Sequence, residues 1–232
     1  MKTLLKVGGI AALLHAVAYI VGIVLGVTLI FPILDANSGQ YVAFVAENQT
    51  LVYIWNLVSY WGSAITLVIM ALALYHRLKA GSPALAQTAT VFGLIWAALI
   101  IGSANLMLYD SGVIASLYAK DPAQAAALWP ALGAVETGIV SGNEMVGSLW
   151  VLLTSIAALR TRVLARTFNY FGVAVSAAGV LTLIPGLVET MRMIFGPGMI
   201  VWSIWLGVVL LMDSRSASSQ PLAFAFVRKG IA

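Results

Sequence analysis

Residues 5–31 read LKVGGIAALLHAVAYIVGIVLGVTLIF, a long apolar run with one charged side chain, Lys6, near its start. A helix needs roughly 20 mostly apolar residues to cross the hydrocarbon core of a bilayer, so this run is long enough to span one. Lys2 and Lys6 could serve as the positive region of a signal peptide, but the apolar run is too long for one and no convincing cleavage site follows it. We therefore expect a retained transmembrane helix.

Five further segments have the same character, and they define the expected fold. Together the six predicted spans are residues 5–31, 51–75, 83–109, 135–159, 168–185 and 196–212. The sequence therefore predicts an all-α integral membrane bundle of about six helices, with one transmembrane domain at 1–213 and a polar cytoplasmic tail at 214–232. Because prolines and glycines cluster between 185 and 198, a re-entrant pair is an alternative for the last two spans.

The composition agrees with a membrane protein. Of 232 residues, 62% are hydrophobic and 9% are charged, and the mean hydropathy is +1.01. Soluble domains carry about 25% charged residues, which they need to cover a surface in contact with water. Cysteine is absent, which excludes disulfides and thiolate ligands. With only two histidines the sequence argues against a zinc site, and we expect neither a metal nor a cofactor.

The basic residues predict the orientation of the bundle. Lys and Arg favour the cytoplasmic side of short loops. If the N-terminus is cytoplasmic, only Lys120 and Arg192 lie outside. The ten basic residues on the inner side are then Lys2, Lys6, Arg77, Lys79, Arg160, Arg162, Arg166, Arg215, Arg228 and Lys229. We therefore expect both termini in the cytoplasm, with the basic residues facing lipid headgroups rather than nucleic acid.

The outer connections and the small residues give further expectations about packing. An interfacial helix is predicted within 32–50, with Tyr41, Val42, Phe44 and Val45 on one stripe, and another around 113–118. Small residues four apart let helices approach closely. Such seams are expected at Gly22 and Gly26, at Gly138 and Gly142, and at Gly172 and Ser176.

His15 is an ionisable residue near the middle of the first span. It lies nine residues after Lys6, roughly 13 Å along a helix. Tyr19, Gly22 and Gly26 follow it on the same face, so its side chain points into the packed seam. Two roles are open, an interhelical hydrogen bond and a ligand or proton-relay function, since ionisable groups inside the hydrocarbon are costly.

A second polar group is expected near the outer side of the membrane. Glu144 and Asn143 lie in the fourth span, and Asn56 and Asn105 lie at comparable depth in the second and third. Trp150 is close to this level. Polar groups within aromatic walls are typical of small-ligand pockets. We therefore predict that these five residues form an outward-facing ligand pocket, the alternative being interhelical hydrogen bonds beside an aromatic belt.

The second half of the chain resembles a known family. The residues that carry the resemblance are 142–153 (GNEMVGSLWVLL), 169–172 (NYFG), 194–202 (IFGPGMIVW) and 205–207 (WLG), with a weaker similarity at 6–12 (KVGGIAA). They are similar to a bacterial multi-spanning membrane family that is catalogued only as a domain of unknown function. The resemblance implies a six-helix bacterial inner-membrane protein and no particular activity.

Three functions are compatible with these features. The leading hypothesis is a non-enzymatic protein that binds a small apolar or amphipathic ligand, such as a lipid or quinone, from the outer side. The second is an accessory subunit of a membrane complex, with a membrane-protein partner or a homo-oligomer. The third is a proton-coupled transporter using Glu144 and His15, although clear inverted repeats and an obviously broken central helix are missing from the sequence. No nucleophile–base pair is visible, so we do not expect an enzyme.

Overall fold

The computed structural model describes residues 2–34, 37–140 and 142–216, and within these ranges the chain is helical apart from short turns, with no β-strand. The α-helices are α1 (Lys2–Leu25), α2 (Phe31–Leu34), α3 (Ser38–Glu47), α4 (Gln49–Asn56), α5 (Ser63–Leu78), α6 (Pro83–Tyr118), α7 (Pro122–Val140), α8 (Asn143–Thr161), α9 (Arg166–Leu181) and α10 (Val188–Ser216). Two π-helical segments, η1 (Gly26–Ile30) and η2 (Leu57–Gly62), and a 3-10 turn, η3 (Pro185–Leu187), complete the described elements. The predicted all-α membrane fold is confirmed.

Five helical stretches of the described chain are long and apolar enough to cross a membrane. They are Thr3–Ile33, Gln49–Leu78, Pro83–Tyr118, Pro122–Thr161 and Pro185–Ser214. The predicted span at 168–185 corresponds to α9, whose 16 residues extend about 24 Å, less than a bilayer core of about 30 Å. Within the described residues, α9 is therefore shorter than the five candidate spans, of which Pro122–Thr161 comprises α7 and α8.

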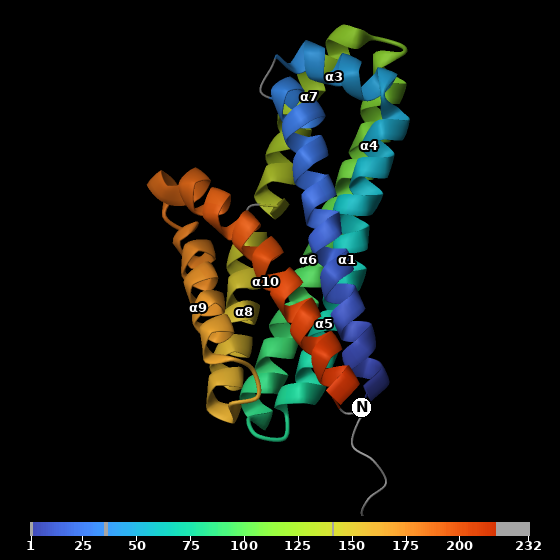
Figure 1. The fold of residues 1–232 in the computed structure, drawn as a ribbon. Coiled ribbons are helices and arrows are strands. Elements are labelled where there is room, and N and C mark those ends of the chain that lie inside the picture. Colours follow the sequence, from blue (N-terminus) through green and yellow to red (C-terminus); the bar gives the residue numbers. More distant parts are fainter. Residues whose placement is uncertain (1, 35–36, 141, 217–232) are drawn as a thin grey trace, which may run out of the picture.

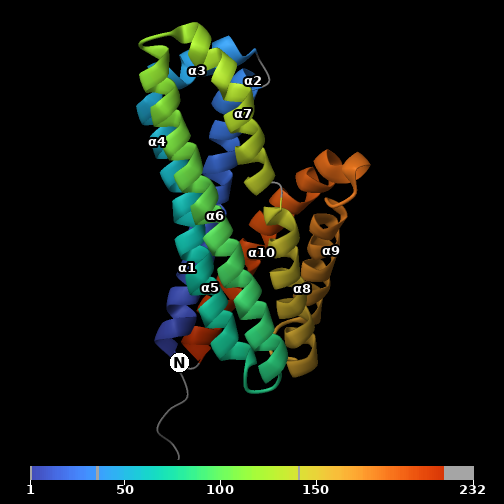
Figure 2. The ribbon, with the colours of Figure 1, turned by 180° about the vertical axis from the view of Figure 1, so that it is seen from behind.

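The long helices are arranged in two groups (Figure 1). One group consists of α1, α6 and the continuous rod formed by α4, η2 and α5, and α3 lies across its end farthest from the N-terminus. The other consists of α8 and α9, which stand side by side, and α10 crosses obliquely from the end of α9 to the N-terminal end of α1. The view from behind shows α6 running the full length of the molecule, with α7 beside one half and α8 beside the other (Figure 2).

The predicted fourth span, 135–159, is interrupted. Helix α7 ends at Val140 and α8 begins at Asn143, with Gly142 in a turn between them (φ −91°, ψ −6°). Glycine is among the weakest helix formers, which favours an interruption at this position. A broken helix that was not expected from the sequence therefore places Asn143 and Glu144 at the start of a new helix.

The outer connections differ from the expectation in one respect. The predicted helix within 32–50 is present as α3, where the Asn37 side chain caps the N-terminus by accepting a hydrogen bond from the Gln40 N–H at 2.9 Å. Val42 and Val45 of its apolar stripe are buried against α6 and α7. A separate interfacial helix at 113–118 does not form, because α6 continues without a break to Tyr118.

Close helix packing is present at two of the predicted seams. A Cβ atom added to Gly22 would lie 2.7 Å from Ser59 Oγ, and one added to Gly172 would lie 2.9 Å from Trp202 Nε1. Gly138 and Gly142 face open space instead, so the predicted seam between them is wrong. The same glycines that were expected to pack α7 against a neighbour border the break in the helix.

Helix α10 is continuous through a segment that suggested a re-entrant turn. Gly196, Pro197 and Gly198 all lie inside the helix, which extends from Val188 to Ser216. The first three residues of the predicted tail, 214–216, belong to α10, and the rest of the tail lies outside the described residues. Helix α10 therefore continues past residue 213, where the membrane domain was predicted to end.

Aromatic side chains form the centre of the second helix group. The ring of Trp150 on α8 lies 5.9 Å from Trp96 on α6 and 5.3 Å from Trp202 on α10, measured between centroids. Phe168 on α9 stacks on Trp202 at 5.4 Å. All four rings are buried to 1% exposure or less. Edge-to-face and stacked aromatic pairs add to the stability that burial provides, so this cluster fixes α8, α9 and α10 against α6.

Candidate functional site

A cavity of about 580 Å³ lies at the end of the bundle opposite the N-terminus, beneath α3. Residues of α2, α3, α4, α6 and α7, both π-helical segments and the N-terminal parts of α8 and α10 line it. Six aromatic side chains contribute to its wall: Phe31, Tyr41, Phe44, Trp55, Tyr60 and Trp129. Its polar lining includes three ionisable residues, Glu136, Glu144 and Arg192, and the amide Asn56, together with the hydroxyl residues Ser38, Ser111 and Thr137. π-Helical turns occur often at functional sites, and here both border the cavity.

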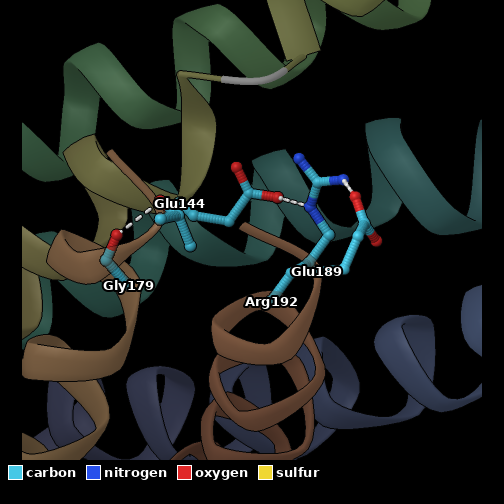
Figure 3. Close-up of polar contacts among 5 residues, drawn as sticks. Glu144, Gly179, Glu189 and Arg192 are labelled. Carbon is cyan, nitrogen blue, oxygen red and sulfur yellow. Dashed lines mark hydrogen bonds and ion pairs between the residues drawn. The ribbon is translucent and has the colours of Figure 1, made fainter. Parts of the chain in front are cut away.

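An ion pair between α8 and α10 lies at the edge of the cavity (Figure 3). Arg192 Nε donates to Glu144 Oε1 at 2.9 Å, and Arg192 Nη1 donates to Glu189 Oε1 at 3.2 Å. The Glu144 side chain is 14% exposed, whereas Glu189 is 75% exposed. Glu144 occupies the first turn of α8, where the partial positive charge of a helix N-terminus favours a carboxylate. Arg192 and the helix end together stabilise this buried charge.

Two buried oxygen atoms of the cavity residues have no hydrogen-bond partner in the described chain. One is Glu144 Oε2, and the other is Asn56 Oδ1. Asn56 is 1% exposed, and its amide nitrogen donates to the Ala104 carbonyl at 3.2 Å, which fixes the orientation of the side chain. Buried polar atoms are nearly always paired with protein or with ordered water. These two acceptors are the groups that a ligand in the cavity could satisfy.

Glu136 is the second carboxylate of the cavity. It projects from α7, is half-buried, and has neither an ion-pair nor a hydrogen-bond partner among the described residues. Tyr41, which also lines the cavity, lies close enough to be affected by it. Burial, reinforced by the Glu136 carboxylate, raises the pKa of the Tyr41 phenol above its usual range.

The aromatic wall is held together by ring contacts. Tyr41 of α3 stacks on Trp129 of α7 with 4.0 Å between ring centroids. Trp55 meets Tyr60 edge to face at 5.5 Å, and Trp55 Nε1 donates to the Gly22 carbonyl of α1 at 3.0 Å. These contacts position the wall of the cavity independently of any bound molecule.

The structure brings together only part of the predicted pocket. Glu144 and Asn56 line the cavity, and Asn143 lies next to Glu144, buried at 9% exposure but not in the wall. Trp150 lies in the central aromatic cluster instead, and Asn105 is exposed on the surface of α6. Asn105 and Trp150 are therefore not part of the cavity.

His15 is buried outside the cavity. Its Nδ1 lies 3.0 Å from the Ser63 carbonyl and 3.1 Å from Thr66 Oγ1, both on α5, and its ring packs against Tyr19 with 4.8 Å between centroids. Of the two roles considered for this residue, the interhelical hydrogen bond is present in the structure. His15 Nδ1 makes this hydrogen bond, and the bond joins α1 to α5.

Several cavity residues were not singled out from the sequence. Glu136 was not among the predicted site residues, and Arg192 was counted only as an outer basic residue. A signal for Arg192 exists, because it is one of only two basic residues on the expected outer side. Tyr41 was expected on an interfacial stripe, and nothing in the local pattern separates Trp129 from the other tryptophans.

The fold and the cavity define a helical integral-membrane protein with a preformed, aromatic-walled polar cavity at one end of its bundle. The chain belongs to the family described as Domain of unknown function (DUF4386), whose model matches residues 7–213. The resemblance noted between 142 and 207 thus extends over nearly the whole membrane domain. No curated protein matches the chain. No solved structure matches it either.

Proposed function

We propose that this protein is a non-enzymatic membrane protein that binds a small apolar or amphipathic molecule in the cavity beneath α3. The observation that carries the proposal is the cavity itself. Its volume of about 580 Å³ lies within the range of small-molecule sites, roughly 300–1,000 Å³. Aromatic walls with a few fixed polar groups are the usual composition of such sites.

We further propose that the cavity faces the outer side of a bacterial inner membrane, with both termini in the cytoplasm. The ends of α5 and α8 and the start of α9, which carry Arg77, Arg160 and Arg166, lie at the same end of the bundle as the N-terminus. The excess of basic residues at this end supports a cytoplasmic location for it. The cavity at the opposite end would then open to the outer leaflet or to the outer solution.

The experiment is native mass spectrometry of the protein released from mild detergent, with a variant that fills the cavity. Val140 lines the cavity at the end of α7, whereas the adjacent Ile139 is exposed and is not one of the lining residues. Val140→Trp should abolish a retained small-molecule mass, and Ile139→Trp should keep it. If the wild-type protein carries no such mass, or if Val140→Trp retains it undiminished, the proposal is wrong. A retained protein partner in place of a small molecule would support the accessory-subunit hypothesis.

A second function, proton-coupled transport, is favoured by one observation. The helix break between Val140 and Asn143 lies at the cavity, and carriers place discontinuous helices at their substrate sites. Glu144, at the start of α8, would be the coupling residue. In proteoliposomes, counterflow of the molecule identified by mass spectrometry should then be lost in Glu144→Gln. Binding without counterflow would contradict transport and support binding as the function.

A further inference from the structure

The carboxyl groups that line the cavity outnumber its cationic side chains. Two carboxylates, Glu136 and Glu144, line it together with one guanidinium, Arg192. Arg192 Nε and Nη1 are directed to Glu144 and to Glu189, the latter outside the cavity wall. Glu136 therefore contributes a carboxyl group that no described residue pairs with, and a cation beside it would stabilise its ionised form. In a membrane protein an ionisable residue away from bulk water is costly unless an opposite charge accompanies it.

The unsatisfied polar atoms of the cavity point to the same kind of ligand. Glu144 Oε2 and Asn56 Oδ1 are both hydrogen-bond acceptors. A ligand that bears only acceptors, such as a carbonyl or a phosphate, would leave both of them unpaired. A ligand with N–H donors would satisfy them, and a charged donor would form the stronger bond because charge-assisted hydrogen bonds exceed neutral ones.

The aromatic wall is suited to a cation as well as to an apolar group. Tyr41, Trp129, Trp55 and Tyr60 line the same cavity as the two carboxylates. The faces of tyrosine and tryptophan rings attract ammonium groups, and aromatic sites with this composition are used to recognise organic cations. The same rings provide apolar surface for the rest of the molecule.

From these three observations we propose that the cavity binds a protonated amine attached to an apolar body, with Glu136 as its counter-ion and with Asn56 and Glu144 as hydrogen-bond acceptors. This inference rests on the proposed binding function and names its ligand class. The amine could belong to a membrane aminolipid or to a soluble amphipathic molecule, since both present the same group to the cavity.

The test compares a cation with a neutral molecule of nearly the same shape. Binding of 2-phenylethylammonium and of 2-phenylethanol is measured by isothermal titration calorimetry on the full chain in phosphatidylcholine nanodiscs. The wild-type protein should bind the ammonium at least tenfold more tightly than the alcohol. Glu136→Gln should weaken the ammonium at least tenfold and change the alcohol less than twofold.

Two controls keep the result interpretable. Glu47→Gln removes an exposed carboxylate of α3 outside the cavity and should leave both affinities unchanged. Because Glu136 has no partner among the described residues, its replacement by Gln should also leave the melting temperature equal or higher. Adding phosphatidylethanolamine to the nanodiscs should lower the apparent affinity of the ammonium if an aminolipid is the natural source, and should leave it unchanged if the amine is soluble.

Equal binding of the ammonium and the alcohol, or no loss in Glu136→Gln, would overturn the inference about charge and leave the binding function standing. Failure of both probes to bind would also overturn it. The retained mass in the Val140→Trp experiment would then decide separately whether the cavity is a binding site at all.

Discussion

At the residue scale, the cost of burying polar groups is the most informative quantity in this chain. Because of this cost, Glu144 and Asn56 were predicted to belong to a pocket, and both are found in the cavity wall. The same cost could not predict that Arg192 pairs with Glu144, because the two residues are 48 positions apart and their distance depends on how the first turns of α8 and α10 are placed. For the same reason Asn105 and Trp150 were misplaced, since similar depth on two helices does not make two side chains face each other.

The Glu144–Arg192 ion pair gives a prediction at this scale. Arg192→Ala leaves the Glu144 carboxylate, at 14% exposure, without its cationic partner. Removing one member of a buried pair is far more costly than removing one at the surface, and Arg192 is itself 38% exposed. We therefore expect an intermediate loss of about 1–3 kcal/mol in the free energy of unfolding, measured by denaturant titration in detergent.

The double variant distinguishes a charge effect from loss of packing. When Glu144 is neutralised in Glu144→Gln, the penalty of Arg192→Ala should fall, since no unpaired charge remains. Additive losses in the double variant would mean that Arg192 contributes through its packing and not through the ion pair.

At the scale of the elements, hydropathy predicted where most helices lie but not where one of them breaks. The windows that identify spans average over about 20 residues, so a local turn at Gly142 inside an apolar stretch is not visible to them. Likewise, the third span was predicted to end at residue 109, whereas α6 continues to Tyr118. Asp110 is buried at 5% exposure within this helix.

The glycines provide a prediction about helix packing. At Gly172 a Cβ atom would lie against the side chains of Ser155 and Trp202, whereas at Gly138 it would meet no atom within 4 Å. Gly172→Ala should therefore lower the free energy of unfolding by about 1–3 kcal/mol through overpacking. Gly138→Ala should leave it unchanged or raise it by about 0.5 kcal/mol, because alanine is the better helix former.

Thermal unfolding of the two variants side by side checks this difference. An equal response of both would show that the spacing of small residues, rather than their contacts in the structure, decides how the helices pack.

At the scale of the whole molecule, the proposed orientation can be measured directly because the chain contains no cysteine. Gln124 is exposed near the start of α7, at the cavity end, and Ala80 is exposed in the turn between α5 and α6, at the N-terminal end. A membrane-impermeant maleimide should label Gln124→Cys in intact cells and Ala80→Cys only after the membrane is permeabilised. The reverse pattern would place the cavity on the cytoplasmic side.

The arrangement of the two helix groups is what the sequence left undetermined. The individual spans follow from apolar length, but the crossing of α10 over the bundle and the placement of α3 across its outer end depend on side-chain contacts between distant segments. The cavity is a product of this arrangement, since its wall draws on residues between Ile30 and Arg192.

An experimental structure of the wild-type protein purified in mild detergent would show whether the cavity holds a small molecule. We expect non-protein density beneath α3, within hydrogen-bond distance of Glu144 Oε2 or Asn56 Oδ1 and in contact with Trp129. A cavity that contains only ordered water, or one that is closed by inward movement of α3 and α7, would contradict the account.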